Sequence, residues 1–234
     1  MVFDVIIPAY NEQDSIGLVV NGLSHENLRY IFVCNNNSTD LTEQVAASQG
    51  AIVLKESRKG YGAACLKGIN HIKENCPTLP DFIVFCDGDY ADDLNALSDL
   101  LMPLAEHRAD LVIGSRVLGH SEAGSLTSVQ KFGNWLSTGL IYYLYKVKFT
   151  DLGPFRAIRW TSLMELNMQD QNFGWTVEMQ VKAAMKNLRC VEIPVNYRKR
   201  IGISKVSGTL KGSFLAGCKI LWTIFSLALK RVFK

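Results

Sequence analysis

Short apolar runs alternate with longer segments of mixed polarity along the first half of the chain. The runs cover residues 5–7, 30–33, 51–54, 82–85 and 111–113. Each run has the length of a buried strand, and the roughly 20 to 30 residues between successive runs leave room for a helix in each crossover. Strands joined by helices in this rhythm form βαβ units. The pattern therefore predicts an α/β fold with a Rossmann-like, mostly parallel sheet flanked by helices.

The rhythm changes after Arg116. A polar loop over residues 119–128 precedes a predicted aromatic-rich helix at about 129–146. A short helix is predicted after the turn at 150–155, and another helix near 176–186. A length of 234 residues suits one sizeable α/β domain. We therefore expect one domain whose second half is organised differently from its first.

The C-terminal segment, residues 209–234, has the pattern of an amphipathic helix. At 100° per residue one stripe is polar and the opposite side is apolar. The polar stripe consists of Lys219, Thr223, Ser226 and Lys230. The apolar stretch at 214–229 is shorter than the roughly 20 residues that span a bilayer. We therefore expect a basic helix lying on an anionic membrane surface, apolar side down. The alternative is a terminal helix docked on its own protein core.

Composition and charge narrow the class of protein. Apolar residues make up 48% of the chain and charged residues 20%, which excludes a disordered or fibrous protein. From Ile193 onward nine residues are Lys or Arg and none is acidic, so this part favours an anionic partner. Nucleic acid is not the expected partner, because the basic residues accompany an apolar helix face and no recognition motif is present.

The cysteines and the N-terminus indicate the compartment. None of the six cysteines belongs to a CxxC pair, and Cys34 and Cys86 end apolar runs, as reduced core residues would. The chain opens directly on a predicted strand, without the charged, apolar and small-residue sections of a signal peptide. We therefore expect a cytoplasmic protein that is peripheral on the cytoplasmic face of a membrane.

Asp87 and Asp89 carry the clearest chemical signal. They follow the run at 82–85, which places two carboxylates in the turn at the carboxyl end of a strand, where ligands of open α/β sheets bind. Carboxylate oxygens in a tight turn suit Mg²⁺ or Mn²⁺, whose shell is completed by water and phosphate oxygens. An Asp-x-Asp pair alone is equally consistent with a solvated turn, after which Asp92 and Asp93 cap the next helix.

Polar or glycine-rich motifs follow the other predicted strands, and further motifs lie in the second half. They are IIPAYNE (6–12), NNNSTD (35–40), RKGYGAACLKGI (58–69), FCDGD (85–89), VIGSR (112–116), TDLGPFRAI (150–158), GWTVEMQVKA (174–183) and VEIPVNYRKRIGISK (191–205). With these motifs in this order, residues 5–205 resemble glycosyltransferase family 2 and, within it, the polyprenyl-phosphate sugar transferases typified by dolichol-phosphate mannose synthase.

The resemblance implies a fold and an activity. The fold would be GT-A, with one glycosyltransferase domain over residues 1–208 that comprises a nucleotide half (1–116) and an acceptor half (117–208). The activity would be transfer of a hexose, with inversion at the anomeric carbon, from a nucleotide diphosphate sugar. The acceptor would be a polyprenyl or dolichyl phosphate at the membrane surface, and the cofactor Mg²⁺ or Mn²⁺.

The resemblance also implies roles for individual residues. The metal ligands would be Asp87 and Asp89. The catalytic residues would be Asp87, Asp89, Arg116, Asp151 and Glu178. The nucleotide-sugar site would consist of Pro8, Tyr10, Glu12, Asn35, Asn36, Lys59, Gly60, Gly62 and Asp87. The acceptor phosphate, or alternatively the donor diphosphate, would be bound by Arg116, Arg156, Arg200 and Lys205. Arg suits this role because its guanidinium pairs with phosphate bidentately.

Two positions depart from the family pattern. Asn35 stands where relatives usually carry Asp, and Ala91 stands where an additional polar metal ligand is common. The Asn35 oxygen can accept the single N3–H of uracil, whereas the two donors of a guanine edge favour a carboxylate. We therefore expect a UDP-sugar donor in preference to GDP-mannose. Ala91 leaves the third protein ligand open, with Asp92 as a candidate.

The acceptor decides whether a general base is needed. A sugar hydroxyl needs a positioned carboxylate, for which Asp151 and Glu178 are the candidates. A phosphate monoester, with a second pKa of about 6, is largely ionised near neutral pH and needs no strong base. In that case Asp151 and Glu178 support the structure or orient the acceptor.

Three other functions compete with this one. The first is transfer to a saccharide or lipid hydroxyl, and the second is nucleotide-sugar binding without catalysis, with Asn35 and Ala91 as signs of decay. A nucleotidyltransferase shares the α/β pattern, but it would be expected to carry a glycine-rich loop and a basic residue after the first strand. This chain has PAYNE there.

Overall fold

The fold is built on one seven-stranded sheet, which a computed structural model describes together with its helices for residues 1–202 and 210–232. The strand order is β3-β2-β1-β4-β6-β5-β7. The strands are β1 (Phe3–Ala9), β2 (Leu28–Asn35), β3 (Ile52–Lys55), β4 (Phe82–Phe85), β5 (Leu111–Ser115), β6 (Arg156–Arg159) and β7 (Cys190–Pro194). β6 runs antiparallel to both of its neighbours, and the other strand pairs are parallel. The predicted α/β fold with a mostly parallel sheet is confirmed.

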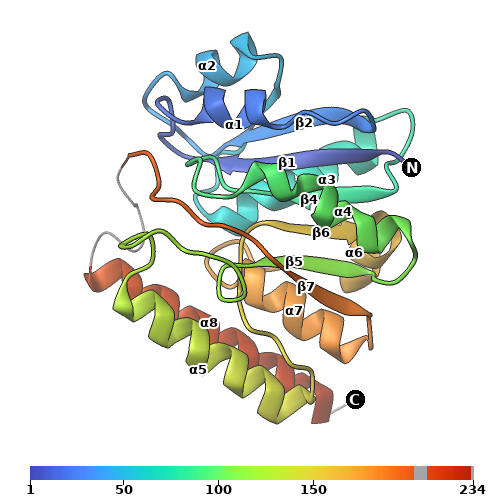
Figure 1. Cartoon of the computed structure of the whole chain (residues 1–234), viewed down its shortest axis with the longest axis vertical. Helices are drawn as coiled ribbons and strands as arrows, with labels where there is room; N and C mark the ends of the chain where they lie inside the picture. Colours follow the sequence, from blue (N-terminus) through green and yellow to red (C-terminus); the bar gives the residue numbers. More distant parts are fainter. Residues whose placement is uncertain (203–209, 233–234) are drawn as a thin grey trace.

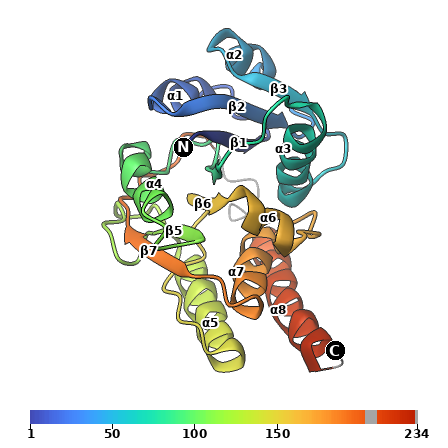
Figure 2. The ribbon, with the colours of Figure 1, turned by 90° about the vertical axis from the view of Figure 1, so that its right-hand side faces the viewer.

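The helices cover both faces of the sheet (Figures 1 and 2). They are α1 (Ile16–Gly22), α2 (Thr42–Ser48), α3 (Tyr61–Asn75), the short 3₁₀ helix η1 (Leu94–Ala96), α4 (Leu97–Ala105), α5 (Ser128–Tyr145), α6 (Trp160–Leu166), α7 (Trp175–Met185) and α8 (Leu210–Val232). Alternate side chains of each strand enter opposite cores, because successive side chains of a strand point to opposite faces. Val5 and Ile7 pack with α1 and α4, whereas Ile6 packs with α3.

Four of the five apolar runs of the sequence lie wholly within strands, and the run at 51–54 begins one residue before β3. β4 shows why they were recognisable, since all four of its residues are buried, as expected for a central strand with both faces covered. The pattern did not predict β6, which begins with Arg156, or its insertion between β4 and β5. This insertion brings the turn at 150–155 to the edge where β4 and β5 end.

α5 and α8 lie side by side at one end of the molecule, with α1 and α2 at the other (Figures 1 and 2). α5 begins at a capping box in which the Thr127 hydroxyl accepts from the Gln130 amide. α8 packs against α5 and α7, and the Tyr145 hydroxyl donates to the Ile224 carbonyl at 3.0 Å. None of the described helices is both long and apolar enough to cross a membrane.

The orientation of α8 corrects a prediction. With its apolar side on a membrane the polar stripe would face water, but Thr223 is buried, and Lys219 forms an ion pair at 2.7 Å with Asp170 in the loop before α7. Lys230, at the end of the stripe, is exposed. The exposed side carries apolar side chains instead, including Trp222 and Phe225. The helix therefore docks on its own domain and also presents an apolar surface outward. The expected boundary between residues 208 and 209 lies outside the described residues.

Candidate active site

Asp87 and Asp89 occupy the turn after β4, as predicted, and backbone and side-chain donors hold both carboxylates. The Tyr61 hydroxyl donates to Asp87 Oδ1 at 3.0 Å, and the Ala91 amide donates to Asp89 Oδ1 at 3.0 Å. Burial, and next the charge of Asp89, raise the pKa of Asp87 to about 7. Such crowding of carboxylates at a strand end favours a bound cation.

Asp92 supports this turn. Its Oδ2 accepts from the Asp87 amide at 3.0 Å, and burial, followed by the charge of Asp87, raises its pKa well above the usual range. Asp93 accepts instead from the side-chain amide of Asn196 at 2.9 Å and makes no side-chain cap bond. The prediction that Asp92 and Asp93 cap the next helix is therefore wrong.

The two carboxylates fit a divalent cation that takes part of its shell from substrate. In the described ranges no three acidic, His or Cys side chains form a group that could enclose a metal ion. Mg²⁺ and Mn²⁺ suit such a site, because Mg²⁺ usually binds one or two carboxylates together with substrate phosphates and water. The donor set of Asp87 and Asp89 is of this kind.

The loop before α3 and the first turn of α3 pack so closely against residues 170–171 that only glycine fits at two positions. Gly60 has φ +142°, and a Cβ added to it would lie 2.0 Å from the Gln171 carbonyl oxygen. A Cβ on Gly62 would lie 2.0 Å from the Asp170 carbonyl oxygen. The Asn36 side chain accepts from the Gly60 amide at 2.8 Å and so ties the loop to the end of β2. The predicted nucleotide residues Asn36, Gly60 and Gly62 are thus brought together.

The remaining predicted nucleotide residues lie at the same edge. Pro8 is in the last part of β1 and Tyr10 follows it with 39% of its surface exposed. Asn35 ends β2, and its side-chain oxygen accepts from the Ser38 amide at 3.0 Å, so the amide group shapes its own turn. Lys59 is exposed next to Gly60. Tyr61 was expected only as part of the stretch at 59–62 that lines the nucleotide, and its hydrogen bond to Asp87 was not predicted.

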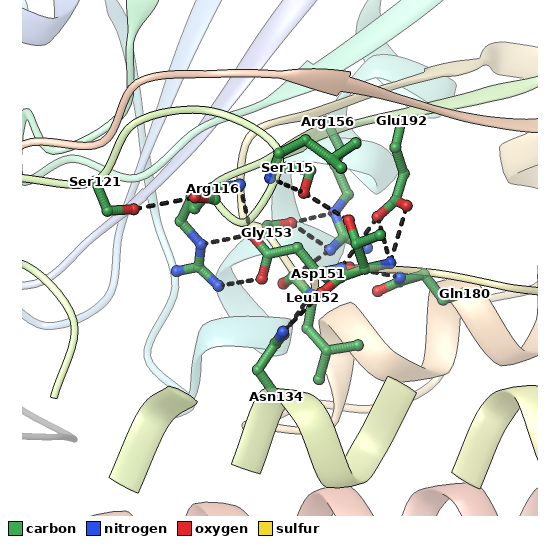
Figure 3. A network of polar contacts seen from close by, with 12 residues as sticks. Ser115, Arg116, Ser121, Asn134, Asp151, Leu152, Gly153, Arg156, Gln180 and Glu192 are labelled. Carbon is green, nitrogen blue, oxygen red and sulfur yellow. Dashed lines mark hydrogen bonds and ion pairs between the residues drawn. The ribbon is translucent and has the colours of Figure 1, made fainter. Parts of the chain in front are cut away.

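Arg116 and Asp151 form a bidentate ion pair (Figure 3). Arg116 Nε donates to Oδ2 at 2.7 Å and Nη2 donates to Oδ1 at 2.8 Å. The Arg116 backbone amide also donates to Oδ2, at 2.9 Å. Both oxygens of Asp151 are therefore engaged, and its ion pair and hydrogen bonds raise the pKa of Arg116 against the effect of burial. The pair leaves a preoriented guanidinium at the site.

The turn that carries Asp151 is held from two sides (Figure 3). Glu192 of β7 accepts from the Thr150 amide at 2.9 Å and from the Asp151 amide at 3.1 Å. Asn134 of α5 donates to the Thr150 carbonyl at 2.8 Å and accepts from the Leu152 amide at 2.8 Å. Neither support could be predicted from the sequence, because nothing in the local sequence pairs α5 or β7 with this turn.

Arg156 does not fit the predicted acceptor site. Its side chain is completely buried and donates to the carbonyls of Leu152, Gly153 and Thr176. Burial lowers its pKa to about 10. Its guanidinium is therefore fully engaged by backbone carbonyls and stabilises the turn at 152–155 from the protein interior. The prediction that Arg156 binds the acceptor phosphate is wrong.

Glu178 is also occupied by the fold. Its carboxylate accepts from the amides of Gln169 and Asp170 and forms an ion pair with Lys182 at 2.8 Å. The side chain is buried, at 4% exposure. Glu178 therefore fastens the loop before α7 and is not positioned as a free base, in contrast to the catalytic role predicted for it.

Arg200 lies on the donor side of the site. Its Nη2 is 3.0 Å from Glu12 Oε1, and its Nη1 is 3.3 Å from Asp89 Oδ2. The predicted acceptor role would place it with Arg116, whereas it contacts the carboxylates of the predicted metal and nucleotide sites. Lys205, the other predicted phosphate ligand, lies outside the described residues.

Comparison with known proteins agrees with this arrangement. The family model described as Glycosyl transferase family 2 matches residues 4–166, more than half of the chain. An uncharacterized glycosyltransferase of Mycobacterium bovis is 34% identical over 91% of this chain and 93% of its own length. A dolichyl-phosphate hexose transferase of Haloferax volcanii is 27% identical over 86% of this chain and 85% of its own length.

Solved structures share the fold. Glucosyl-3-phosphoglycerate synthase of Mycobacterium tuberculosis, in complex with Mn²⁺, UDP and glucosyl-3-phosphoglycerate, matches with a TM-score of 0.73 and 19% identity. The match covers 97% of this chain and 80% of that one. The predicted GT-A fold is confirmed, and the chain belongs to glycosyltransferase family 2 as a glycosyltransferase.

Proposed function

We propose that this glycosyltransferase moves a hexose from a UDP-sugar to a polyprenyl phosphate, with inversion at the anomeric carbon. The observation that carries the proposal is the position of Arg116. Its partner turn at 150–152 is hydrogen-bonded to Asn134 of α5, and α5 exposes aromatic side chains outward. A cationic group for a phosphate thus adjoins a helix suited to contact the lipid that carries the phosphate.

The state of the candidate bases supports an acceptor that is already anionic. Both oxygens of Asp151 accept from Arg116, and the carboxylate of Glu178 accepts backbone amides and pairs with Lys182. Neither group is positioned to take a proton from a hydroxyl. A phosphate monoester needs no such transfer, because it is largely ionised near pH 7. Arg116 would orient its oxygen toward the sugar through charge-assisted hydrogen bonds.

The outward side of α5 and α8 supports a membrane location for the acceptor. The exposed apolar residues are Val129, Phe132, Trp135, Tyr142 and Tyr143 of α5 and Leu215, Trp222, Phe225 and Leu229 of α8. Neither helix contains an acidic residue. Apolar and aromatic side chains with basic neighbours suit the interface of an anionic bilayer. We therefore propose a peripheral protein on the cytoplasmic face of a membrane.

The donor side is proposed to bind a nucleoside diphosphate with Mg²⁺ or Mn²⁺. Asp87 and Asp89 would hold the divalent cation, whose chemistry is to neutralise the leaving diphosphate. The loop at 58–62 would lie against the nucleotide, with Asn36 fixing its position. The preference for UDP over GDP rests on Asn35, whose carboxamide oxygen keeps a second lone pair beside the bond to Ser38.

Release of nucleoside diphosphate tests this proposal. UDP- and GDP-sugars would be incubated with the protein, with Mn²⁺ or with EDTA, and with or without a short polyprenyl phosphate. We expect UDP release that requires both the divalent cation and the lipid phosphate. If a saccharide or a lipid alcohol stimulates UDP release instead, the acceptor is a hydroxyl group and not a phosphate. Nucleotide binding without turnover under every condition would indicate a catalytically silent binding protein.

A further inference from the structure

Arg200 is held by two carboxylates of the donor side at once. We propose that Arg200 is a counter-cation of Asp89 and Glu12 before ligands bind, and that it releases Asp89 when a divalent cation and a nucleoside diphosphate bind together. This inference rests on the proposed metal-dependent donor site. It assigns to Arg200 a role in coupling the binding of cation and nucleotide, separate from any contact with the acceptor.

Arg200 contacts the oxygen of Asp89 that a metal ion would use. Asp89 Oδ1 already accepts from the Ala91 amide, so Oδ2 is the oxygen left for a metal ion. Arg200 Nη1 lies 3.3 Å from this Oδ2. A guanidinium and a divalent cation repel each other strongly at the distances that a shared oxygen imposes, above all where burial limits screening. Occupancy of Oδ2 by a metal ion therefore requires Arg200 to move away.

One buried N–H donor of Arg200 lacks an acceptor among the described residues. Arg200 Nε is buried and has no hydrogen-bond partner within the described ranges. A buried N–H without an acceptor destabilises the protein, and a guanidinium binds two phosphate oxygens through adjacent N–H groups. A diphosphate beside Asp89 would give the side chain the acceptors that it lacks and would replace the carboxylate that it gives up.

Release of Asp89 requires only the side chain of Arg200 to move. The backbone on either side is fixed to the metal-site turn, because the Arg198 amide donates to the Ala91 carbonyl at 2.9 Å and the Ile201 amide donates to the Asp89 carbonyl at 3.0 Å. The side chain itself is 30% exposed, which leaves it room for another rotamer. Arg200 thus stays at the site in either position.

A side chain that opposes one ligand and assists the other makes their binding interdependent. Without nucleotide, a divalent cation must displace Arg200 with no compensation. With nucleotide, the displaced guanidinium gains the diphosphate. By thermodynamic linkage, each ligand then raises the affinity for the other by the same factor.

The test is Mn²⁺ binding, followed by the electron paramagnetic resonance signal of free Mn²⁺, with and without UDP. The proteins are wild type, Arg200→Gln and the control Arg198→Gln, whose side chain lies 3.5 Å from Asp93 and over the ring of Tyr90. Without UDP, we expect Arg200→Gln to bind Mn²⁺ on the order of tenfold more tightly than wild type, and with UDP more weakly. Arg198→Gln should match wild type in both, and Arg200→Lys should keep the weak binding without UDP.

A change of Mn²⁺ affinity in opposite directions with and without UDP distinguishes this role of Arg200 from simple structural support. If Arg200→Gln weakens Mn²⁺ binding both with and without UDP, or changes neither, the inference is overturned. Thermal unfolding of each variant would show whether the site remains folded, and Arg200→Lys provides a milder change. If neither wild type nor any of the variants binds Mn²⁺ even with UDP, the proposed metal site is wrong, and the inference about Arg200 is overturned with it.

Discussion

The guanidinium of Arg116 lies edge to edge with the carboxylate of Asp151, with two N–H groups on two oxygens at 2.7 and 2.8 Å. The Asp151 side chain is 1% exposed and that of Arg116 is 14% exposed. The guanidinium of Arg116 also lies over the ring of Tyr197, 5.1 Å from its centroid. An arginine fixed on two sides in this way presents its remaining donors in one orientation, as recognition of an oxyanion requires.

Replacing Asp151 by Asn should destabilise the protein. The change leaves the Arg116 guanidinium without its counter-charge in a buried place, and breaking a buried ion pair typically costs about 3–5 kcal/mol of unfolding free energy. Urea denaturation would measure the loss. Glu122→Gln, at the exposed pair with Lys199, is the control and should change little. A loss no larger than that of the control would show that the pair does not support the fold.

Glu178→Gln should leave hexose transfer within about tenfold of wild type. The carboxylate accepts backbone amides and pairs with Lys182, so Gln conserves part of these contacts and the reaction loses no base. Initial rates with a polyprenyl phosphate acceptor, corrected for the folded fraction, give the measurement. Complete loss of turnover in a folded variant would return Glu178 to a catalytic role and favour a hydroxyl acceptor.

Gly62→Ala should destabilise the protein and Gly139→Ala should not, although both glycines lie in helices. A Cβ at Gly62 would lie 2.0 Å from the Asp170 carbonyl oxygen, so the backbone must shift, at a cost of roughly 1–3 kcal/mol or more. A Cβ at Gly139 meets nothing within 4 Å, and Ala there should add about 0.5–1 kcal/mol. Thermal and urea unfolding of the two variants would compare them. Equal effects would contradict the close packing described at Gly62.

Trp222→Ser and Phe225→Ser should weaken binding to anionic lipid vesicles without lowering stability. Both side chains are exposed on α8, and burial of a large apolar side chain in the interface is worth about 1.5–3 kcal/mol. Cosedimentation with vesicles measures the partitioning. Met102→Ser, an equally simple change at an exposed position of α4, should bind as wild type does. Undiminished binding of the α8 variants would exclude this face as the contact with lipid.

Asp110 should contribute stability that is lost in acid. Hydrogen bonds from Arg189 lower its pKa below the ordinary carboxyl value of about 3.9, against an opposing effect of burial. The folded state therefore favours the ionised form, and the contribution is present above the unfolded pKa and disappears as pH falls through the folded pKa. Asp110→Asn should reduce the difference in unfolding free energy between pH 7 and about pH 3. An unchanged difference would mean that Arg189 does not stabilise the carboxylate.

The order of apolar and polar residues was enough to predict five of the seven strands and the edge of the sheet at which the chemistry lies. The signal is clearest in β4 and β5, all of whose residues are buried, because burial on both faces leaves a continuous apolar run. Asp87 and Asp89 could be placed at a strand end from local order alone. Gly60 and Gly62 were predicted as part of the nucleotide site, but their close contacts with the carbonyls of 170 and 171, more than a hundred residues further along the chain, were not predicted.

Which side chains meet and which face inward depends on the packing of elements that are far apart in the sequence. The antiparallel insertion of β6 brings Asp151 to Arg116, sends Arg156 into the core and leaves Glu192 of β7 to hold the turn between them. The same holds for α8, where Lys219 pairs with Asp170 and Thr223 is buried, whereas Trp222 and Phe225 face outward. Periodicity shows that a helix has two different sides, but the partner available to each side depends on contacts between distant segments, and these form only in the folded chain.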